Sequence, residues 1–415
     1  MRNVLTDSIL NRTEVDLHMI TSKDRAIRVA NIIEEAKLGG PQVRIARLAE
    51  HNDAETTVVM PTNNSEDFRH LLKQKNIKFH TLYLTRITKE PSAAIQYILF
   101  SFFEIFSLYM FFKKEAFDIV HASGGAWQYK GVIAGKLAGC KVIWHLNDTA
   151  LPRFFRWIFR QLSIIPDYYI FASNRTKSYY LPLIRKKSTP YGLVRQPVNT
   201  KMFCPEVESK SWSDSHNPKS DLITIGTVAN INPIKGLELF ILVASNLNKF
   251  FENLRFIIVG PVHNSQKKYF EELQTYAAGL DVKNLVFFGK SSNVKKNLSS
   301  FDVFLCTSVN ESGPLTLWEA MSMQKAIVTT DVGDVREHLS LGISGDIVEV
   351  GDANDMTSKV AALVSDSAKR ERYGKEARKV ILEKFDTQLC AMSQLSIYRE
   401  VAAFQNGNSA GILRE

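Results

Sequence analysis

The sequence predicts an α/β protein in which two Rossmann-like, doubly wound parallel-sheet domains face each other across a cleft. Its 415 residues exceed what one ordinary hydrophobic core organises. Short β-branched and apolar runs recur along the chain, and each is followed by a segment with helical periodicity. Strands that are apolar throughout and alternate with helices are typical of parallel sheets covered on both faces.

The apolar runs form two sets of about six. The first set begins with VANII or VRIARLA and continues with TTVVMP, FHTLYL, FDIVHAS, KVIWHLN and DYYIFAS. The second set consists of LITIGTV, LRFIIVG, LVFFG, VFLCTS, AIVTTDVG and DIVEV. Ligands of open parallel sheets bind beyond the carboxyl ends of the strands, so the residues that follow each run are the candidates for function.

A polar, Ser-rich stretch without periodicity, near residues 204–220, is interpreted as the linker between the two domains. We therefore expect a polar N-terminal leader at 1–26, a first domain at 27–205 and a second domain at 206–394. A C-terminal helix at about 395–415 is expected to pack back on the first domain.

The composition is that of a folded protein, with 45% apolar and 23% charged residues. The four cysteines are scattered at spacings unlike those of metal ligands, which predicts free thiols in a reducing compartment and no metal site. The N-terminus lacks an apolar h-region, so we expect no signal peptide and a cytoplasmic location.

Positive charge is concentrated in one part of the chain. The formal net charge is +9, and the stretch from Leu151 to Arg195 alone carries nine Lys and Arg residues against the single acid Asp167. Such a concentration indicates an anionic neighbour, either a membrane surface or a phosphorylated ligand, and we expect no nucleic-acid partner.

Two helical segments of the first half favour contact with a membrane surface. Residues 95–112, IQYILFSFFEIFSLYMFF, are the most apolar in the chain, and a buried or interfacial helix is expected there, with a bilayer span as the alternative. In LPRFFRWIFRQLSII, three basic residues recur at helical spacing among aromatic residues: Arg153, Arg156 and Arg160. The alternative is an ordinary helix with solvated arginines.

The segment ESGPLTLWEAM, residues 311–321, combines two carboxylates with a Gly-Pro break. Glu311 follows the strand VFLCTS, Pro314 suits the first position of a helix, and Glu319 lies inside that helix. One carboxylate can accept hydrogen bonds from the two hydroxyls of a ribose while the other lies by a reacting centre. The alternative is a pair of glutamates on a solvated helix.

A lysine is predicted at the same edge of the second sheet. VANINPIKG, residues 228–236, follows the strand LITIGTV and precedes a helix, which puts Lys235 at the start of that helix. A lysine there is a suitable partner for a diphosphate, although a surface lysine is the alternative.

These motifs resemble those of the retaining glycosyltransferases of family 4, which have the GT-B fold. The resemblance extends over roughly 30–395. It is carried by Glu311 and Glu319, which are separated by SGPLTLW and followed by AM, and by three further segments: QKAIVTTDVGDVRE, GISGDIVEVGDANDM and RQPVNTKMFCP at 195–205. It implies a nucleotide-diphosphate sugar as donor in the second domain, an acceptor in the first, and neither a metal nor another cofactor.

The resemblance also implies roles for single residues. Glu319 is expected to hold the ribose, Lys235 the diphosphate, and Glu311 the transferred sugar, with the amides around Gly313 and Leu315 completing the anion site. Asn230 stands where the family usually has an arginine, so Lys235 is expected to bind the diphosphate with less help. Two further departures are Gln324 and Asp334, which replace common glycines.

Candidates in the first half follow three strands. The turn at Gly39 and Gly40 lets backbone approach a ligand closely, although a plain tight turn is the alternative. The family resemblance implies that this loop faces the donor phosphate and the acceptor. His121 ends FDIVHAS and is the better candidate for a catalytic histidine in the cleft. His145, near the end of KVIWHLN, is a weaker candidate on the acceptor side, and a structural histidine is the alternative for both.

The functional hypothesis is a hexosyl transfer with retention from a nucleotide-diphosphate sugar to a lipid-linked or saccharide acceptor, in surface polysaccharide or glycan assembly. The enzyme is expected to be cytoplasmic and peripheral on the inner face of the cytoplasmic membrane. The alternatives are another GT-B nucleotide-sugar enzyme, such as an epimerase or phosphorylase, and a catalytically silent, membrane-associated protein that binds nucleotide sugars.

Overall fold

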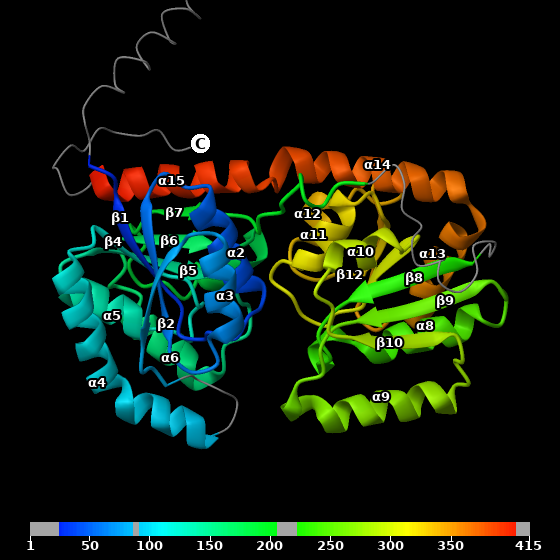
Figure 1. Ribbon diagram of the computed structural model, residues 1–415, viewed down its shortest axis with the longest axis horizontal. Coiled ribbons are helices and arrows are strands. Elements are labelled where there is room, and N and C mark those ends of the chain that lie inside the picture. The colour runs from blue at the N-terminus through cyan, green and yellow to red at the C-terminus, as the bar shows by residue number, and fades with distance from the viewer. Residues whose placement is uncertain (1–24, 86–90, 206–221, 404–415) are drawn as a thin grey trace, which may run out of the picture.

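The computed structural model describes residues 25–85, 91–205 and 222–403, which fold into two α/β domains lying side by side (Figure 1). Most of the predicted leader and all but the first residues of the predicted linker lie outside the described residues. Each domain is a parallel sheet with helices on both faces, so the predicted fold class is confirmed.

The first domain is built on a seven-stranded sheet with the order β3-β2-β1-β4-β5-β6-β7. Of the two possible first strands, VANII forms β1, whereas VRIARLA belongs to helix α2. The short last strand was not expected from the sequence. The strands are β1 (Arg28–Ile32), β2 (Glu55–Pro61), β3 (Lys78–Leu82), β4 (Ile119–Ala122), β5 (Lys141–Leu146), β6 (Tyr168–Phe171) and β7 (Tyr191–Leu193). The helices are α2 (Gly40–Glu50), α3 (Glu66–Gln74), α4 (Pro91–Glu115), α5 (Lys130–Leu137), α6 (Arg153–Leu162) and α7 (Asn174–Tyr180).

The second domain has a six-stranded sheet with the order β10-β9-β8-β11-β12-β13, and every predicted run forms its strand. The strands are β8 (Ile223–Val228), β9 (Leu254–Val259), β10 (Leu285–Gly289), β11 (Val303–Cys306), β12 (Ala326–Thr330) and β13 (Asp346–Val348). Its helices are η1 (Pro233–Lys235), α8 (Leu237–Leu247), η2 (Asn264–Gln266), α9 (Lys267–Gly279), α10 (Val294–Ser299), α11 (Leu315–Ser322), α12 (Val335–His338), α13 (Ala353–Ser365) and α14 (Ser367–Lys384).

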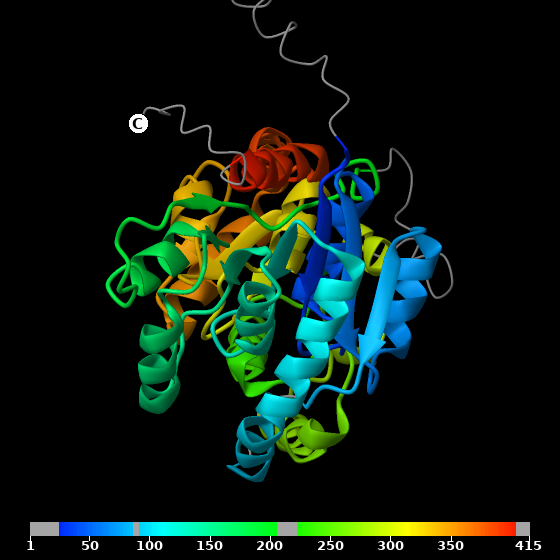
Figure 2. The same ribbon diagram turned by 90° about the vertical axis from the view of Figure 1, so that its left-hand side faces the viewer.

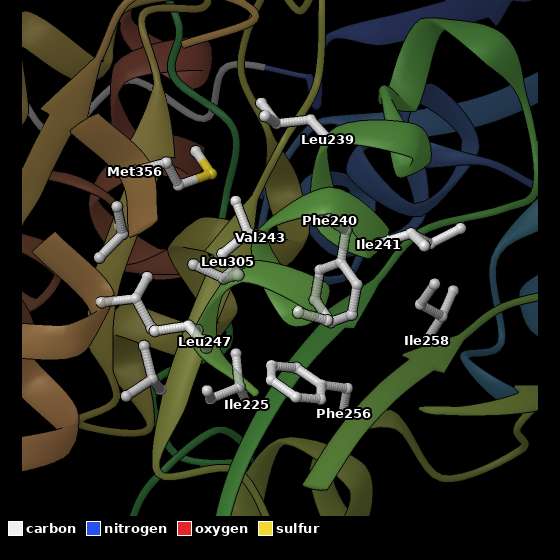
Figure 3. Close-up of a cluster of buried hydrophobic side chains, with 14 of the residues drawn as sticks. Ile225, Leu239, Phe240, Ile241, Val243, Leu247, Phe256, Ile258, Leu305 and Met356 are labelled. Carbon is white, nitrogen blue, oxygen red and sulfur yellow. The ribbon is translucent and has the colours of Figure 1, made fainter. Parts of the chain in front are cut away.

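The apolar runs form strands because both faces of each sheet are covered. In the second domain, helix α8 packs Phe240, Val243 and Leu247 against Ile225 of β8 and Phe256 of β9 (Figure 3). All five side chains are fully buried. Burial of each such side chain contributes roughly 1.5–3 kcal/mol to the stability of the fold, and this packing holds the strands in place.

The last helix of the chain, α15 (Thr387–Ala403), leaves the second domain and lies on the first (Figure 1). Its side chains Leu395, Tyr398 and Val401 pack with strands of the first sheet. The sequence places the C-terminal helix at about 395–415, whereas α15 begins at Thr387; residues 404–415 lie outside the described residues. Residues before 395 also take part in this packing, because Cys390 and Ala391 belong to the same buried cluster as strand residues of the first domain.

Two chain segments run between the domains and pair with each other. The Val198 amide donates to the Phe385 carbonyl at 2.7 Å, and the Thr387 amide donates to the Val198 carbonyl at 3.0 Å. The two crossings therefore form one hydrogen-bonded hinge, which ties the two sheets together at a single side of the molecule.

Helix α4 runs along the outer surface of the first domain (Figure 2, cyan). Its residues Ile95–Glu115 are long and apolar enough to cross a membrane by length and composition. Glu104, however, is buried in an ion pair with Lys130 of α5, so one face of α4 belongs to the fold. The other face is exposed and apolar along its length, with Ile95, Leu99, Phe102, Phe103, Phe106 and Met110.

Candidate active site

A pocket of about 810 Å³ opens where the strand ends of the two domains meet. The first domain contributes the loop after β1, the start of α2 and Asn147 after β5, and the second contributes the loops after β8, β9, β10 and β11. Both sheets thus present their carboxyl ends to one space, as expected for open parallel sheets. Of the predicted site residues, six line the pocket: Gly40, Asn230, Lys235, Glu311, Gly313 and Leu315.

Lys235 and Glu311 contact each other in this pocket. The Lys235 ammonium forms an ion pair with Glu311 Oε1, which also accepts a hydrogen bond from Ser308 Oγ at 3.1 Å. Their two loops are held together because the Val309 amide donates to the Ile234 carbonyl at 2.8 Å. Both residues line the pocket at the strand ends where the sequence places them, and their direct contact is a finding of the structure.

A glycine makes this close approach of the two loops feasible. Gly236, which follows Lys235, has a φ of 57°, and a Cβ atom on it would lie 2.3 Å from the Thr307 carbonyl oxygen. A left-handed conformation favours glycine, and the contact leaves no room for a side chain. Lys235 itself ends the short helix η1 just before α8, close to its predicted place at a helix start.

The N-terminus of α11 faces the pocket. Gly313, Pro314, Leu315 and Thr316 all line it. Pro314 is the residue before the first helical position, one place earlier than predicted, and its carbonyl already accepts from the Leu317 amide at 3.0 Å. The free amides of the first turn and the positive end of the helix dipole favour an anion here.

Glu319 lies one turn deeper in α11 and is not among the residues that line the pocket. Its carboxylate is buried and forms an ion pair with Arg47 of α2 at 2.6 Å. Burial raises the pKa of Glu319, and the Arg47 guanidinium opposes this rise. The sequence predicted the carboxylate but not its partner, because Arg47 belongs to the other domain.

Three basic residues of the pocket were not predicted: Lys37, His263 and Lys290. Burial lowers the pKa of His263, and the charges of Lys37 and Lys290 lower it further. Lys290 is also 3.4 Å from Asp67 of the first domain. Each of the three follows a strand, β1, β9 or β10, so a systematic reading of strand ends could have found them.

His121 does not lie in the pocket, which corrects the prediction of a catalytic histidine in the cleft. Only 1% of its surface is exposed, its Nδ1 is 2.7 Å from the Tyr398 hydroxyl, and its Nε2 is 3.2 Å from His145 Nδ1. Burial, assisted by the charge of Arg44, lowers the pKa of His121 to about 3. The His121 ring packs against His145 of β5 and Tyr398 of α15, so this side chain belongs to the core of the first domain.

His145 is likewise buried and stacked on His121, so its expected place beside an acceptor is also corrected. Arg44 of α2 donates to His145 Nε2 at 3.0 Å and to the Ser123 carbonyl at 3.0 Å. Because arginine only donates, Nε2 of His145 must accept and its Nδ1 must carry the proton. Both histidines are therefore buried structural residues of the first domain, which was the alternative for each.

The turn at Gly39 and Gly40 is partly as predicted. Gly40 begins α2 and lines the pocket, whereas Gly39 is the capping residue before that helix and does not line it. The turn therefore brings the N-terminus of α2 to the pocket from the first domain, facing that of α11.

The three arginines of α6 lie outside this pocket. Arg153, Arg156 and Arg160 surround a separate surface hollow of about 470 Å³, together with Trp157, Gln161 and Arg185. The predicted basic stripe is thus present, and Arg185 adds a fourth guanidinium from the segment after α7. Arg185 donates to Gln161 Oε1 at 2.8 Å, which ties the two elements together.

Side chains from both domains meet around the pocket. Arg175 of α7 donates to the carbonyls of Asp331 and Gly333 at 3.2 and 3.3 Å. Thr149 donates to the Asn310 side chain at 3.3 Å. These hydrogen bonds join α7 and the segment after β5 of the first domain to loops of the second domain. In the described part of the chain, no group of three His, Cys, Asp or Glu side chains could hold a metal ion.

The two domains match two family models. Residues 38–202 match the model of Glycosyltransferase Family 4, and residues 208–380 match that of Glycosyl transferases group 1. The alpha-maltose-1-phosphate synthase of Mycobacterium tuberculosis is 38% identical over 117 residues, which are 26% of this chain and 30% of that protein. The chain therefore matches about a third of the length of this curated relative.

Two further similarities extend over more of the molecule. The lipopolysaccharide core biosynthesis mannosyltransferase LpcC of Rhizobium leguminosarum bv. viciae is 22% identical over 251 residues, 60% of this chain and 67% of that protein. Anabaena HepE, solved with UDP and glucose, superposes with a TM-score of 0.77 over 90% of this chain and 99% of that chain, at 15% identity. This similarity establishes the GT-B fold that the motifs implied.

Proposed function

We propose that this chain, whose two domains match Glycosyltransferase Family 4 and Glycosyl transferases group 1, is a glycosyltransferase that uses a nucleotide-diphosphate sugar. The observation that carries the proposal is the Lys235–Glu311 ion pair beside the N-terminus of α11, in a pocket between the two domains. A cation and free helix amides favour a diphosphate, and the carboxylate suits a sugar hydroxyl.

The proposed chemistry depends on charge that develops on the leaving group. As the glycosidic bond to the diphosphate breaks, negative charge grows on the phosphate oxygen, where Lys235 and the first amides of α11 stabilise it. The closed domain arrangement keeps water away and so limits hydrolysis of the donor. We propose retention by attack on the same face of the sugar, with a diphosphate oxygen accepting the acceptor proton and with no metal or further cofactor.

The proposed acceptor is a lipid-linked saccharide at the inner face of the cytoplasmic membrane. Two surface features of the first domain support it: the apolar exposed face of α4 and the arginine hollow on α6. Aromatic and aliphatic side chains beside a basic cluster are typical of a surface that contacts anionic lipid. The Rhizobium relative is a lipopolysaccharide core mannosyltransferase, which is consistent with such an acceptor.

The alternative of a protein that binds nucleotide sugars without catalysis has one observation in its favour. Asn230 lines the pocket where a second cation would otherwise assist Lys235. An epimerase or a phosphorylase on the same fold is distinguished by its reaction, because an epimerase converts the donor without a second substrate and a phosphorylase requires inorganic phosphate.

A panel of nucleotide sugars tests the proposal on the full chain. The matching donor is expected to raise the melting temperature, since a ligand at about 100 times its Kd adds roughly 2.7 kcal/mol to stability. Incubation with that donor is then expected to give nucleoside diphosphate faster with an acceptor than without one. A panel without any stabilising donor contradicts the proposal, and epimerised donor without an acceptor favours the epimerase.

A further inference from the structure

We infer that Arg47 is a positioning residue for the donor site, because it holds the Glu319 carboxylate from the opposite domain. The inference rests on the proposed function and on the role that the family resemblance implies for Glu319, which is to accept the ribose hydroxyls of a nucleotide sugar. It adds Arg47 of the first domain to the predicted donor-binding residues Lys235 and Glu319 of the second. Donor recognition then depends on the two domains being closed.

Two helices from different domains converge on the pocket. Helix α2 begins at Gly40 and α11 at Leu315, and both residues line the pocket. Arg47 lies two turns after Gly40 on the same face of α2, and Glu319 lies one turn after Leu315 on the same face of α11. The ion pair therefore joins the two helices directly behind their pocket-facing ends.

The Arg47 guanidinium is fixed by more than this one contact. One of its amino groups donates to Glu319 Oε1 at 2.6 Å, and the other donates to the Pro197 carbonyl at 2.8 Å. The guanidinium carbon also lies 5.5 Å from the centre of the Phe203 ring. Pro197 and Phe203 belong to the first hinge segment, so Arg47 links the hinge to Glu319.

Only Oε1 of Glu319 is engaged by Arg47. A carboxylate has two oxygens with several lone pairs, so Oε2 can accept a ribose hydroxyl while Oε1 keeps its arginine. Arg47 thus fixes the rotation of the carboxylate without competing for its second oxygen. Orientation of a binding group by a neighbour of this kind lowers the entropy lost when the ligand binds.

Arg47 also determines the charge of Glu319. Burial raises the pKa of the carboxyl, and Arg47 is the charged group that lowers it. Without the guanidinium, the buried carboxyl protonates at a higher pH, and its protonated oxygen then donates a hydrogen bond where the carboxylate only accepts. On the elements around this pair, Arg44 contacts His145, Glu50 pairs with Lys75, Arg378 donates to the Ser322 carbonyl, Asp334 Oδ2 lies 3.2 Å from His338 Nε2, and Asp386 accepts from Thr200. The ring Nδ1 of His51 lies 3.1 Å from the Arg47 carbonyl.

The test measures donor affinity as a function of pH on the full chain. Nucleotide-sugar Kd is determined by calorimetry between pH 5 and pH 8 for the wild type, Arg47→Met and Arg47→Lys. Arg47→Met is expected to weaken binding at pH 7 by about 10- to 100-fold, as loss of a charged partner does. As the pH is lowered, the affinity of Arg47→Met is expected to begin to decrease at a higher pH than that of the wild type. Arg47→Lys is expected to recover part of both effects.

Arg175→Met is the matched control, because Arg175 also joins the two domains but donates only to the carbonyls of Asp331 and Gly333. It is expected to leave the pH dependence of donor binding unchanged. The inference is overturned if Arg47→Met binds the donor like the wild type, or if both variants shift the pH profile equally. A wild type that binds no nucleotide sugar overturns the proposed function itself, and with it the role of Arg47. Thermal unfolding of each variant identifies one that does not fold, and Arg47→Lys then carries the test.

Discussion

Lys235 and Glu311 contact each other although 76 positions separate them in the chain. Each is set by its own short loop after a strand, and the loops meet because β8 and β11 are neighbours in the sheet. A sequence reading of strand ends was sufficient to predict both residues, since neighbouring parallel strands end at the same edge. The contact itself is a property of the sheet order.

Replacement of Lys235 by alanine is expected to reduce turnover by about 100- to 1000-fold, as does removal of one group that stabilises developing charge. Steady-state measurement of nucleoside diphosphate release checks this. Lys283→Ala is the control, because Lys283 is exposed on the same domain, away from the pocket. Equal turnover of wild type and Lys235→Ala contradicts the assignment of the diphosphate to this lysine.

The buried histidines predict a dependence of stability on pH. The pKa of His121 is lowered to about 3 in the folded chain, whereas an unfolded histidine titrates near 6.5. Below about pH 6.5 the unfolded state therefore binds a proton that the folded state excludes, so stability falls as pH falls towards 3. For one such histidine the loss between pH 7 and pH 5 is about 2 kcal/mol.

Urea unfolding at pH 7 and pH 5 measures this loss. His121→Asn is expected to lower stability at both values but to show a decrease between them that is smaller by about 2 kcal/mol. The exposed His70, replaced in the same way, serves as the control and is expected to keep the wild-type decrease. A His121→Asn protein with the full decrease shows that another group is responsible.

At the scale of elements, α4 and α6 differ from the other helices of the first domain in what they expose. Helix α4 leaves an apolar face uncovered, and α6 exposes Phe154 and Trp157 among its arginines. The sequence identified α4 because it is the most apolar segment of the chain, and α6 because its arginines recur at helical spacing. The sequence did not predict that Arg185 joins the arginines of α6, since that contact crosses from another element.

Replacement of Arg153, Arg156 and Arg160 together by glutamine is expected to release the protein from anionic vesicles, because each basic residue near such a surface contributes about 1 kcal/mol. Co-sedimentation with anionic vesicles that contain about 30 mol% phosphatidylglycerol measures the bound fraction. Replacement of the exposed Lys267, Lys268 and Lys283 on the second domain by glutamine removes the same number of positive charges and is expected to have little effect on vesicle binding. Unchanged binding of the arginine variant contradicts the proposed membrane surface.

At the scale of the whole molecule, the C-terminal helix couples the two domains. Helix α15 belongs to the second half of the chain but packs on strands of the first sheet, where Tyr398 also reaches His121. The core of the first domain is therefore complete only when α15 is in place. The hinge at Val198 and Asp386 sits at the point where this helix leaves the second domain.

A chain that ends at Asp386 is expected to lose folding of the first domain while the second domain keeps its structure. Leu395, Ile397, Tyr398 and Val401 are buried by this packing, and together they contribute roughly 6–12 kcal/mol, which is comparable to the stability of a whole domain. Hydrogen exchange measured peptide by peptide distinguishes the two domains. A chain that ends at Ala403 is the control, and equal protection in both truncated chains contradicts this coupling.

The sequence by itself determined the two parallel sheets, the strand ends that carry Lys235 and Glu311, and the family resemblance. These features depend on local periodicity and on short motifs, which are written within a few tens of residues. Only the tertiary structure decided which side chains are exposed to the pocket and which are buried beside it. His121 and Glu319 both follow the expected spacing, yet one is enclosed by Arg44, His145 and Tyr398 and the other is paired with Arg47. Those partners come from distant elements, because burial and pairing depend on how the helices and the two domains pack and not on neighbouring residues in the chain.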